Sequence, residues 1–368
     1  MSSLPSQHRA LVLESVGSDF IIKSLPTTLP TPGSAVVQIH CTGVLSYHRE
    51  IYNGSRPYPF PLPIVGGFSA IARIVALGPD AVSLNEGQLV YVDCVVRGRD
   101  DRSTLFLSAI HNGFSEGSRS LMRDVWRDGT FAEFARVPLE NCIALNEPRL
   151  CGELGYSLQD LIYLCYLLVP YGGLRDIKLE PGETIVMCPA TGGFGGVQVA
   201  VAMGARVIAM GRNEEELKRL KQHIKRGTPS ATIETVKMTG DVEMDAAALQ
   251  KFGTIDAALD ISPPAAAQST HLKSVINSLR KGGRASLMGS GGYHINDWKI
   301  MGDNITLKGK LMYERDDIVQ LVKMLENGLL PRGKDFVDVK PFSLEEWKEA
   351  FDTAAEFTGV GRLVVMKP

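Results

Sequence analysis

A glycine-rich run at residues 189–196 is the part of this sequence best suited to hold a ligand through its backbone. An apolar stretch precedes it at residues 184–188, and a stretch compatible with a helix follows at once. Ala190, Gly192 and Gly195 occupy the three fixed positions of the G-x-G-x-x-G pattern. Glycine lets the backbone approach a diphosphate closely, and N–H groups at the start of the helix donate to its oxygens. The run therefore predicts a dinucleotide site, and the competing interpretation is a glycine-rich turn that binds nothing.

The next predicted strand, residues 206–210, ends where a dinucleotide site recognises the adenosine ribose. An NAD site places Asp or Glu at this point, because a carboxylate binds the ribose hydroxyls. This sequence has Gly211 and Arg212 instead. Glycine leaves room for a 2′-phosphate, and a guanidinium pairs with phosphate in a planar, charge-assisted contact. We therefore expect NADP(H), and not S-adenosylmethionine, whose site also holds a ribose by its hydroxyls. The alternative for Arg212 is a solvated charge that opens a helix.

Two patterns of segments must position these residues. Short apolar runs separated by Gly and Pro fill residues 10–142 and predict a mainly β domain, with a charged, irregular surface excursion at residues 97–126. Strand and helix patterns alternate over residues 161–312, which predicts a parallel sheet covered on both faces. The last part, residues 316–368, has two helical segments and a final strand. The sequence therefore predicts an α/β protein.

Composition and charge exclude several classes of function. A length of 368 residues exceeds one ordinary core and fits two domains. The formal net charge of −2 provides no long-range attraction to nucleic acid or to anionic membrane. Residues 1–9 lack the apolar core of a secretory signal, and no apolar stretch reaches the roughly 20 residues that cross a bilayer. We therefore expect a soluble, cytoplasmic protein with no nucleic-acid or membrane partner. None of its 6 cysteines forms a C-x-x-C pair, so we expect them to be reduced and buried.

Short segments along almost the whole chain resemble the medium-chain dehydrogenase/reductase superfamily. They are, in chain order, residues 41–48, 61–69, 86–90, 128–133, 183–198, 255–260, 282–289 and 361–365. The resemblance implies a GroES-like β domain formed by both chain ends, residues 1–160 and 316–368. It implies a Rossmann NADP-binding domain with a doubly wound parallel sheet, residues 161–315, and an active site in the cleft between the two. It also implies a homodimer that pairs the edge strands at residues 305–312.

The resemblance further implies that this chain lacks the zinc of the zinc-dependent branch. Leu45 stands where that branch has a cysteine, and Phe68 and Ser69 stand where it has a His-Glu pair. Cys165 aligns with the third zinc ligand, but a catalytic zinc takes three protein ligands and a water. Of the four cysteines that hold the structural zinc of that branch, only Cys94 is present. We therefore expect no bound metal, as in the quinone oxidoreductase and enoyl reductase-like branch.

Without zinc, hydrogen-bond donors must stabilise a developing oxyanion. The resemblance places Tyr47 where the zinc branch has its proton-relay hydroxyl, with His48 beside it. Tyr47 could donate to an alkoxide or enolate, and His48 could return a proton near neutral pH. The alternatives are that Tyr47 only lines an apolar pocket and that His48 bonds to backbone or to the cofactor ribose. Solvent could also supply the proton, so that no side chain is essential.

The predicted function combines these inferences. The predicted cofactor contacts are Ala190, Thr191, Gly192, Gly193, Phe194, Gly195, Gly211, Arg212, Asn213, Ser262, Met288, Gly289, Ser290 and Arg362. We expect NADPH-dependent reduction of an activated C=C bond, in an enone, a quinone or an enoyl compound, of a small apolar substrate. A zinc-free carbonyl reductase or alcohol dehydrogenase on the same scaffold is the first alternative. An NADPH-binding sensor or structural protein without turnover is the second.

Overall fold

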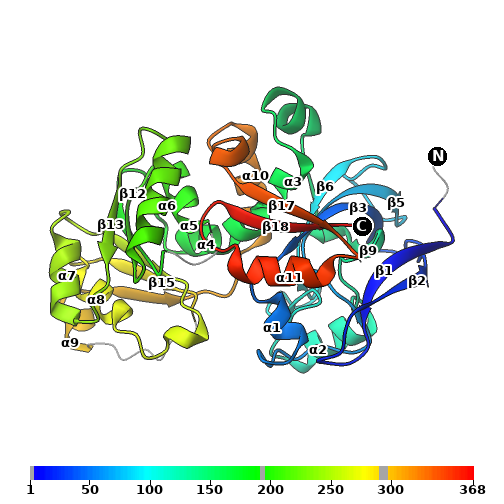
Figure 1. The fold of residues 1–368 in the computed structure, drawn as a ribbon, viewed down its shortest axis with the longest axis horizontal. Helices are drawn as coiled ribbons and strands as arrows, with labels where there is room; N and C mark the ends of the chain where they lie inside the picture. The colour runs from blue at the N-terminus through cyan, green and yellow to red at the C-terminus, as the bar shows by residue number, and fades with distance from the viewer. Residues whose placement is uncertain (1–3, 191–194, 290–296) are drawn as a thin grey trace. The chain divides into compact units, whose positions relative to one another are not determined.

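The computed structural model describes residues 4–190, 195–289 and 297–368, which divide into two units (Figure 1). Unit 1 contains Met1–Cys165, Asp338–Thr358 and Leu363–Pro368, and unit 2 contains Tyr166–Val337 and Gly359–Arg362. Some predicted cofactor contacts lie outside the described residues, namely Thr191, Gly192, Gly193, Phe194 and Ser290.

Unit 1 is built on antiparallel sheets. The smaller sheet has the order β2 (Ile21–Pro26), β1 (Gln7–Leu13), β4 (Ile64–Val65). The larger has the order β10 (Cys142–Ala144), β6 (Leu89–Val92), β5 (Ala70–Leu77), β3 (Ser34–Val44), β18 (Arg362–Lys367), β17 (Asp338–Ser343), and β9 (Phe134–Pro138) also pairs with β3. Val364 of β18 lies opposite Val44 of β3, so the chain end completes the sheet that the N-terminal segment begins. Strands from both chain ends therefore share one sheet of unit 1.

The helices of unit 1 are short. They are α1 (His48–Tyr52), α2 (Glu116–Asp124), α3 (Leu158–Leu161) and α11 (Trp347–Glu356). The predicted irregular excursion at residues 97–126 contains α2 and also β8 (Leu105–Leu107), which pairs with β7 (Val95–Arg97). Helix α2 begins with reciprocal hydrogen bonds of 3.1 Å between Ser115 and Ser118, each side chain accepting from the other's N–H. A serine at both positions is a weaker sequence signal than the usual Ser with Glu, so the helix was not predicted.

Unit 2 contains a six-stranded parallel sheet. Its order is β13 (Ile233–Lys237), β12 (Arg206–Gly211), β11 (Thr184–Cys188), β14 (Ala257–Asp260), β15 (Arg284–Leu287), β16 (Thr306–Gly309). Every neighbouring pair is parallel. The strand order reverses between β11 and β14, and in such sheets ligands bind beyond the carboxyl ends of the strands at that point.

Helices cover both faces of this sheet (Figure 1). They are α4 (Leu164–Asp176), α5 (Gly196–Ala202), α6 (Glu214–Gly227), α7 (Val242–Gln250), α8 (His271–Ser278), α9 (Asp297–Gly302) and α10 (Arg315–Glu326). On one face α5 packs so closely that a Cβ added to Gly196 would lie 2.5 Å from Met187 Cε. On the other, Val275 of α8 belongs to the same core cluster as Val186. Val186 and Met187 are adjacent in β11, so their side chains point to opposite faces of the sheet. Helices α8 and α5 therefore lie on opposite faces, and the predicted doubly wound sheet is confirmed.

Residues 316–337 cluster with unit 2, whereas the predicted domain boundary placed them with the β domain. Arg175 of α4 donates to Asp317 of α10 over 3.1 Å, which ties α10 to the helices of the parallel sheet. Short helical turns occupy Leu139–Asn141, Pro148–Glu153, Pro264–Ala266 and Gly333–Asp335.

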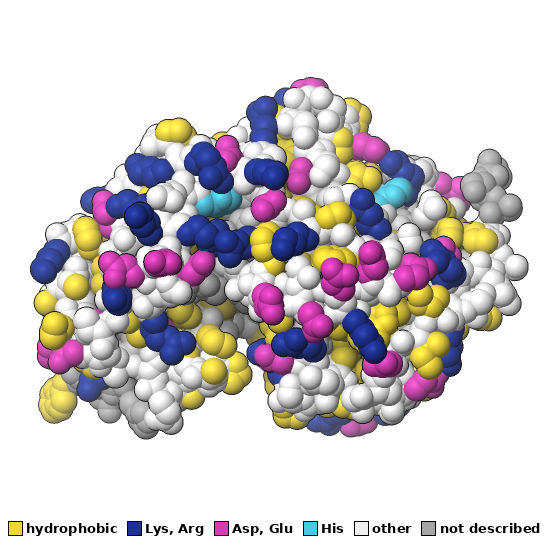
Figure 2. All heavy atoms as spheres, viewed as in Figure 1, with side chains coloured by type: hydrophobic (Ala, Val, Ile, Leu, Met, Phe, Trp, Pro, Cys, Tyr) yellow, Lys and Arg dark blue, Asp and Glu magenta, His cyan; other side chains and the backbone are white. Residues whose placement is uncertain are grey.

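The surface and the helix lengths agree with the composition. Acidic and basic side chains are interspersed over the face shown in Figure 2, in keeping with the small net charge. Within the described ranges, no helix combines the length and the apolar character that crossing a membrane requires.

Candidate active site

The carboxyl edge of the unit 2 sheet gathers the predicted cofactor-binding segments. The chain after β11 is held against β12, because the Ala190 N–H donates to the Met210 carbonyl over 2.8 Å. Gly195 then stands at the start of α5. Strand, glycine turn and helix follow one another as in sites that bind a dinucleotide diphosphate. Ala190 follows β11 and Gly195 precedes α5, and they are the described residues on either side of the turn.

The end of β12 presents the residues predicted to select the cofactor. Gly211 is the last residue of the strand and is buried, while Arg212 is exposed. Within the described part of the chain, Arg212 has no hydrogen-bond or ion-pair partner. Asn213 caps α6, since its Oδ1 accepts from the N–H groups of Glu215 at 3.0 Å and Glu216 at 3.1 Å. The cap occupies the Asn213 oxygen and leaves its amide nitrogen as the group that could donate to a ligand.

Carboxylates in the first turn of α6 would repel an anion bound at the end of β12, and nearby cations offset their negative charge. Lys237 at the end of β13 lies 3.1 Å from Glu214, and Arg219 lies 2.8 Å from Glu216. Nη1 of Arg362 is 3.9 Å from the other oxygen of Glu216. The structure therefore brings Arg362, which the resemblance alone implied, to the first turn of α6. These cations make the surroundings of the strand end compatible with a 2′-phosphate.

A buried polar cluster stands at the carboxyl end of β14. Asp260, Ser262 and His271 are each at most 5% exposed. Nε2 of His271 lies 2.7 Å from Ser262 Oγ and 3.1 Å from Asp260 Oδ1, and the Ser262 hydroxyl donates to the same Asp260 oxygen. Nδ1 of His271 is 2.8 Å from Ser269 Oγ. Since a carboxylate only accepts, Nε2 carries the proton in this arrangement.

These three residue types can form a nucleophilic triad, but the geometry is different. In a triad the serine and the carboxylate contact different imidazole nitrogens, whereas here both contact Nε2. The cluster instead fixes the segment after β14 beside the end of β15, where a Cβ on Gly289 would lie 2.6 Å from Asp260 Oδ2. The Met288 N–H donates to the Asp260 carbonyl over 2.8 Å. Ser262, Met288 and Gly289 are thus brought together at this edge.

Sequence reasoning missed Asp260 and His271. Asp260 is the last residue of β14, and an acid at the end of a strand was a signal that could have been used. His271 follows 11 residues later, beyond a turn, and no local pattern connects the two.

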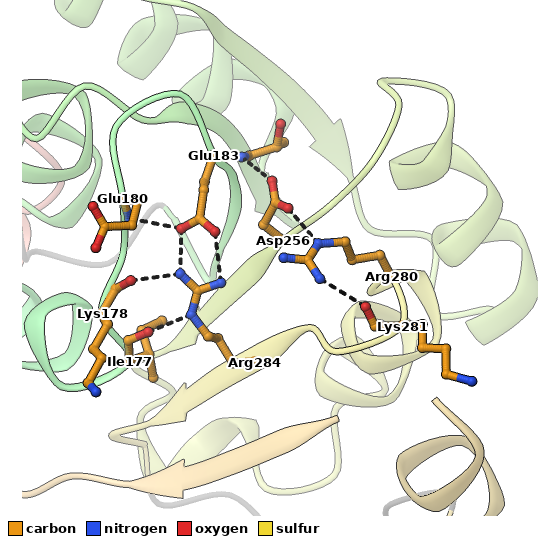
Figure 3. A network of polar contacts seen from close by, with 9 residues as sticks. Ile177, Lys178, Glu180, Glu183, Asp256, Arg280, Lys281 and Arg284 are labelled. Atoms are coloured by element: carbon orange, nitrogen blue, oxygen red, sulfur yellow. Dashed lines mark hydrogen bonds and ion pairs between the residues drawn. The ribbon is translucent and has the colours of Figure 1, made fainter. Parts of the chain in front are cut away.

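The opposite, amino edge of the same sheet carries a closed network of polar contacts (Figure 3). Arg284 at the start of β15 donates to both carboxylate oxygens of Glu183, one of them at 2.9 Å. It also donates to the carbonyls of Ile177 at 2.5 Å and Lys178 at 2.7 Å. Although burial of Glu183 opposes the effect, the hydrogen bonds from Arg284 hold the pKa of this carboxyl below its usual value.

A second ion pair continues the network along the amino edge. Arg280 donates to Asp256 Oδ1 over 2.6 Å, and Asp256 Oδ2 accepts from the Thr184 N–H over 2.8 Å. Burial of Asp256 is outweighed by these hydrogen bonds, which lower the pKa of the carboxyl. Strands β11, β14 and β15 are thereby joined at the edge away from the predicted cofactor site.

In unit 1, two apolar side chains that the resemblance places where the zinc branch has ligands are buried. Leu45 and Phe68 are each 3% exposed. A Cβ on Gly43 would lie 3.3 Å from both Cys165 Sγ and Phe68 Cε1, so these side chains meet over β3. The Tyr91 hydroxyl donates to Ser69 Oγ over 3.1 Å. No group of three His, Cys, Asp or Glu side chains placed to share a metal ion occurs among residues 4–190, 195–289 and 297–368.

Tyr47 stands at the start of α1 beside this group. Its side chain is half-buried, and the guanidinium carbon of Arg56 lies 4.3 Å from its ring centroid. Burial raises the pKa of the Tyr47 phenol, and the neighbouring Tyr58, Cys94 and Cys165 raise it further, against the opposing effect of Arg56. The phenol therefore remains protonated at neutral pH and is able to donate a hydrogen bond.

His48 has different surroundings. Its Nδ1 accepts from the Leu45 N–H over 3.2 Å, and its Nε2 has no partner within the described residues. Aromatic rings surround it, with centroids 5.4 to 5.9 Å away, from Tyr52, Phe68, Phe131 and Phe351. Burial lowers the pKa of His48 to about 3, so the imidazole is neutral at pH 7. Of the two alternatives for this residue, the hydrogen bond to backbone is the one that the structure contains. A neutral imidazole with so low a pKa does not support an acid role at neutral pH.

Two family models match the chain. Residues 31–147 match the alcohol dehydrogenase GroES-like domain, and residues 193–327 match a model described as zinc-binding dehydrogenase. Alcohol dehydrogenase 1 of Neurospora crassa is 23% identical over 98% of both chains. Alcohol dehydrogenase 1 of Emericella nidulans is 27% identical, and this match spans 58% of the present chain and 59% of that protein.

Solved structures share the fold across the whole chain. The alcohol dehydrogenase rspB from E. coli CFT073, solved with NADH, has a TM-score of 0.77 at 18% identity, covering 99% of this chain and 100% of that one. A cobalt- and zinc-bound alcohol dehydrogenase from Pyrobaculum aerophilum has a TM-score of 0.72 at 19% identity, covering 98% and 100%. With both domain models matched in the expected order, the chain is a member of the medium-chain dehydrogenase/reductase superfamily and an oxidoreductase of that type.

Proposed function

We propose that this protein is an NADP(H)-dependent oxidoreductase that uses no zinc and reduces an activated C=C bond of a small apolar substrate, such as an enone, a quinone or an enoyl compound. One observation carries the proposal. The positions that the resemblance assigns to two zinc ligands hold the buried side chains of Leu45 and Phe68, and the protonated phenol of Tyr47 lies near Cys165, which packs close to Phe68. Neither apolar side chain can bind a metal, so a hydrogen-bond donor must take over the stabilisation of the developing oxyanion.

The cofactor proposal rests on the end of β12. Gly211 has no side chain to fill the space of a 2′-phosphate, and the exposed guanidinium of Arg212 has no partner among the described residues. A 2′-phosphate would pair with Arg212, and the nearby Arg362 would add to the favourable charge. NADPH would supply the hydride. The buried cluster around Asp260 would hold the end of β14 in a fixed position beneath the dinucleotide.

The protein's own part in the reaction would be to bind the substrate oxygen and stabilise its developing negative charge by hydrogen bonding. Tyr47 would donate its phenol hydrogen to the enolate oxygen, which gains negative charge as hydride reaches the β carbon. Since His48 is neutral and sealed among aromatic rings, solvent is the better candidate for the source of the final proton.

A carbonyl reductase or alcohol dehydrogenase without zinc is the second candidate. The names of the Neurospora crassa and Emericella nidulans relatives favour it, because both are alcohol dehydrogenases. The same phenol would then face an alkoxide. A third candidate is an NADPH-binding sensor or structural protein without turnover.

One panel of assays distinguishes these candidates. NADPH oxidation is followed with enones, quinones, enoyl thioesters, aldehydes and ketones, in enzyme treated with EDTA and in enzyme given added zinc. The proposal predicts the highest kcat/KM on a conjugated C=C substrate, unchanged by EDTA, with zinc far below stoichiometric in purified protein. Preference for aldehydes or ketones would establish the second candidate, and no turnover on any substrate the third. Stoichiometric zinc with activity lost on chelation would refute zinc independence.

We further propose a homodimer that pairs the β16 edges of two sheets. Strand β16 ends the sheet order, and large apolar side chains near it are exposed, with Trp298 at 78%, Met301 at 62% and Leu311 at 46%. Light scattering on the purified protein should give the mass of two chains, and Trp298→Glu should shift it to one. A monomeric wild-type protein would refute this assembly.

A further inference from the structure

A hollow of about 290 Å³ opens on unit 1, and all of its lining residues belong to that unit. Strands of the smaller sheet and the β3–β9 pair line it, together with the loop that follows α2. Apolar side chains form part of its floor, with Val36, Val65 and Ala132 buried and Phe134 partly exposed beside them. This part of the floor suits the apolar body of a small molecule.

Arginines stand around the mouth of this hollow, and two of them are neutralised by their own neighbours. Arg123 lies 2.9 Å from Asp124, and Arg127 lies 3.1 Å from Asp128. Arg136 also lines the hollow and has no carboxylate partner within the described residues. The two carboxylates of the lining are therefore already engaged, and the charge left over is that of one guanidinium.

Arg136 is held in place by contacts that leave most of its donors free. It lies on β9 opposite Val36 of β3. Its guanidinium carbon is 5.6 Å from the ring centroid of Trp126, and Nη2 donates to the Val125 carbonyl over 3.3 Å. A guanidinium has five N–H donors, so a carboxylate can still bind it through two parallel hydrogen bonds. The ring of Phe134 completes the wall beside it.

We propose that this hollow is a second ligand site, which binds an organic anion with a flat apolar body, such as an aromatic carboxylate. The carboxylate would pair with Arg136, and the ring system would lie on the apolar floor between Trp126 and Phe134. The site is independent of the proposed cofactor and substrate.

A neighbouring hollow of about 530 Å³ also reaches Arg136, and it suits an anion less well. Asp100, Asp101 and Glu140 contribute carboxylates to its lining. Its Arg99 is already paired with Glu140 at 2.7 Å. The anion is therefore assigned to the hollow with the apolar floor.

The test uses 2-naphthoate as the anionic probe and 2-naphthamide as its uncharged counterpart, both titrated calorimetrically into the full-length protein. Wild type should bind the carboxylate at least about tenfold more tightly than the amide, as expected of a charge-assisted pair. Arg136→Gln should remove that preference while leaving the melting temperature unchanged. Arg119→Gln is the matched control, because this arginine on α2 pairs with Glu116 and is not part of the lining.

Saturating NADPH is present throughout, so that binding at the cofactor site is not measured. Undetectable binding of 2-naphthoate, equal binding of the amide, or unchanged binding in Arg136→Gln would each overturn the proposal. Binding of 2-naphthoate should also quench the fluorescence of Trp126. Trp126→Phe should still bind the probe but should show no such quench. A quench that survives in this variant would place the probe elsewhere.

Discussion

The two edges of the unit 2 sheet both carry arginines, and they use them in opposite ways. At the amino edge, Arg284 and Glu183 are each about one-fifth exposed, with the arginine bound to a carboxylate and two carbonyls. At the carboxyl edge, Arg212 is exposed and has no partner among the described residues. A charge satisfied by the protein contributes to stability, whereas a charge left open is available to a ligand. Under the proposed function, this difference separates residues that stabilise the fold from residues that bind the cofactor.

The same contrast occurs within two adjacent residues of unit 1. His48 is enclosed by aromatic rings and bonded to backbone, while Tyr47 is half-buried with a protonated hydroxyl. His48, like Arg284 at the amino edge, is enclosed by the protein, whereas Tyr47, like Arg212, has a polar group that a ligand could bind. Substitutions on the two sides should therefore change different quantities.

The largest effect is expected from Arg284→Met. It leaves a partly buried Glu183 without its partner, so the free energy of unfolding should fall by about 2–3 kcal/mol. Affinity for NADPH should stay within twofold of wild type, because the network lies at the edge away from the proposed site. Urea denaturation and a cofactor titration measure the two quantities. The more exposed Arg280→Met is the control, with an expected loss below about 1 kcal/mol.

The pH dependence of Arg284→Met sharpens this test. Since the folded state lowers the pKa of Glu183, the pair stabilises the protein above the unfolded pKa of about 4.5 and loses that contribution as the pH falls further. The difference in unfolding free energy between wild type and Arg284→Met should therefore become smaller below that pH. A constant difference, or a large loss of NADPH affinity, would contradict the assignment of this edge to stability.

His48→Gln should change how stability varies with pH. The folded pKa of His48 is about 3 and the unfolded value is 6.5, so below pH 6.5 only the unfolded state gains the proton. This residue should therefore cost the wild type about 2 kcal/mol of unfolding free energy between about pH 7 and pH 5. The variant should not show this loss of unfolding free energy. Burial and nearby arginines lower the pKa of His223 to about 4, so the loss due to His223 should remain in both proteins. Parallel pH curves would show that His48 is not sealed in its neutral form.

Tyr47→Phe should lower kcat by at least about tenfold with cofactor affinity unchanged, because it removes one donor and keeps the ring. Backbone donors or water that share the oxyanion would keep the loss smaller than that seen for a sole donor. Steady-state kinetics on the best substrate of the panel measure the effect. Turnover within twofold of wild type would remove Tyr47 from the chemistry and leave solvent and backbone to stabilise the oxyanion.

Much of the fold followed from local patterns in the sequence. Strand β11 was predicted with its observed bounds, because an apolar run meets a glycine cluster there. The helix patterns predicted over residues 161–312 include α6, which begins where three glutamates follow the capping Asn213. Such signals act between neighbours along the chain, so the sequence alone reveals them.

The missed features depend on contacts between distant residues. The network of Arg284 joins it to Ile177, 107 residues away, and no periodicity records that contact. The pairing of Asp260 with His271 likewise requires a turn whose path is set by tertiary packing. The enclosure of His48 depends on Phe351, which arrives from the far end of the chain. Residue type alone suggested an acid–base role for His48, and the burial that opposes this role appears only in three dimensions.

If the open carboxyl edge binds a dinucleotide with a 2′-phosphate, NADPH and NADH should differ in affinity, and paired titrations of the two cofactors test this most directly. A bidentate arginine–phosphate contact of about 1.5–3 kcal/mol predicts that NADPH binds at least about tenfold more tightly than NADH. Arg212→Ala should erase most of this preference with NADH affinity and unfolding free energy unchanged, while Lys218→Ala, an exposed lysine on α6, should preserve it. Equal dissociation constants for the two cofactors in the wild-type protein would contradict the account.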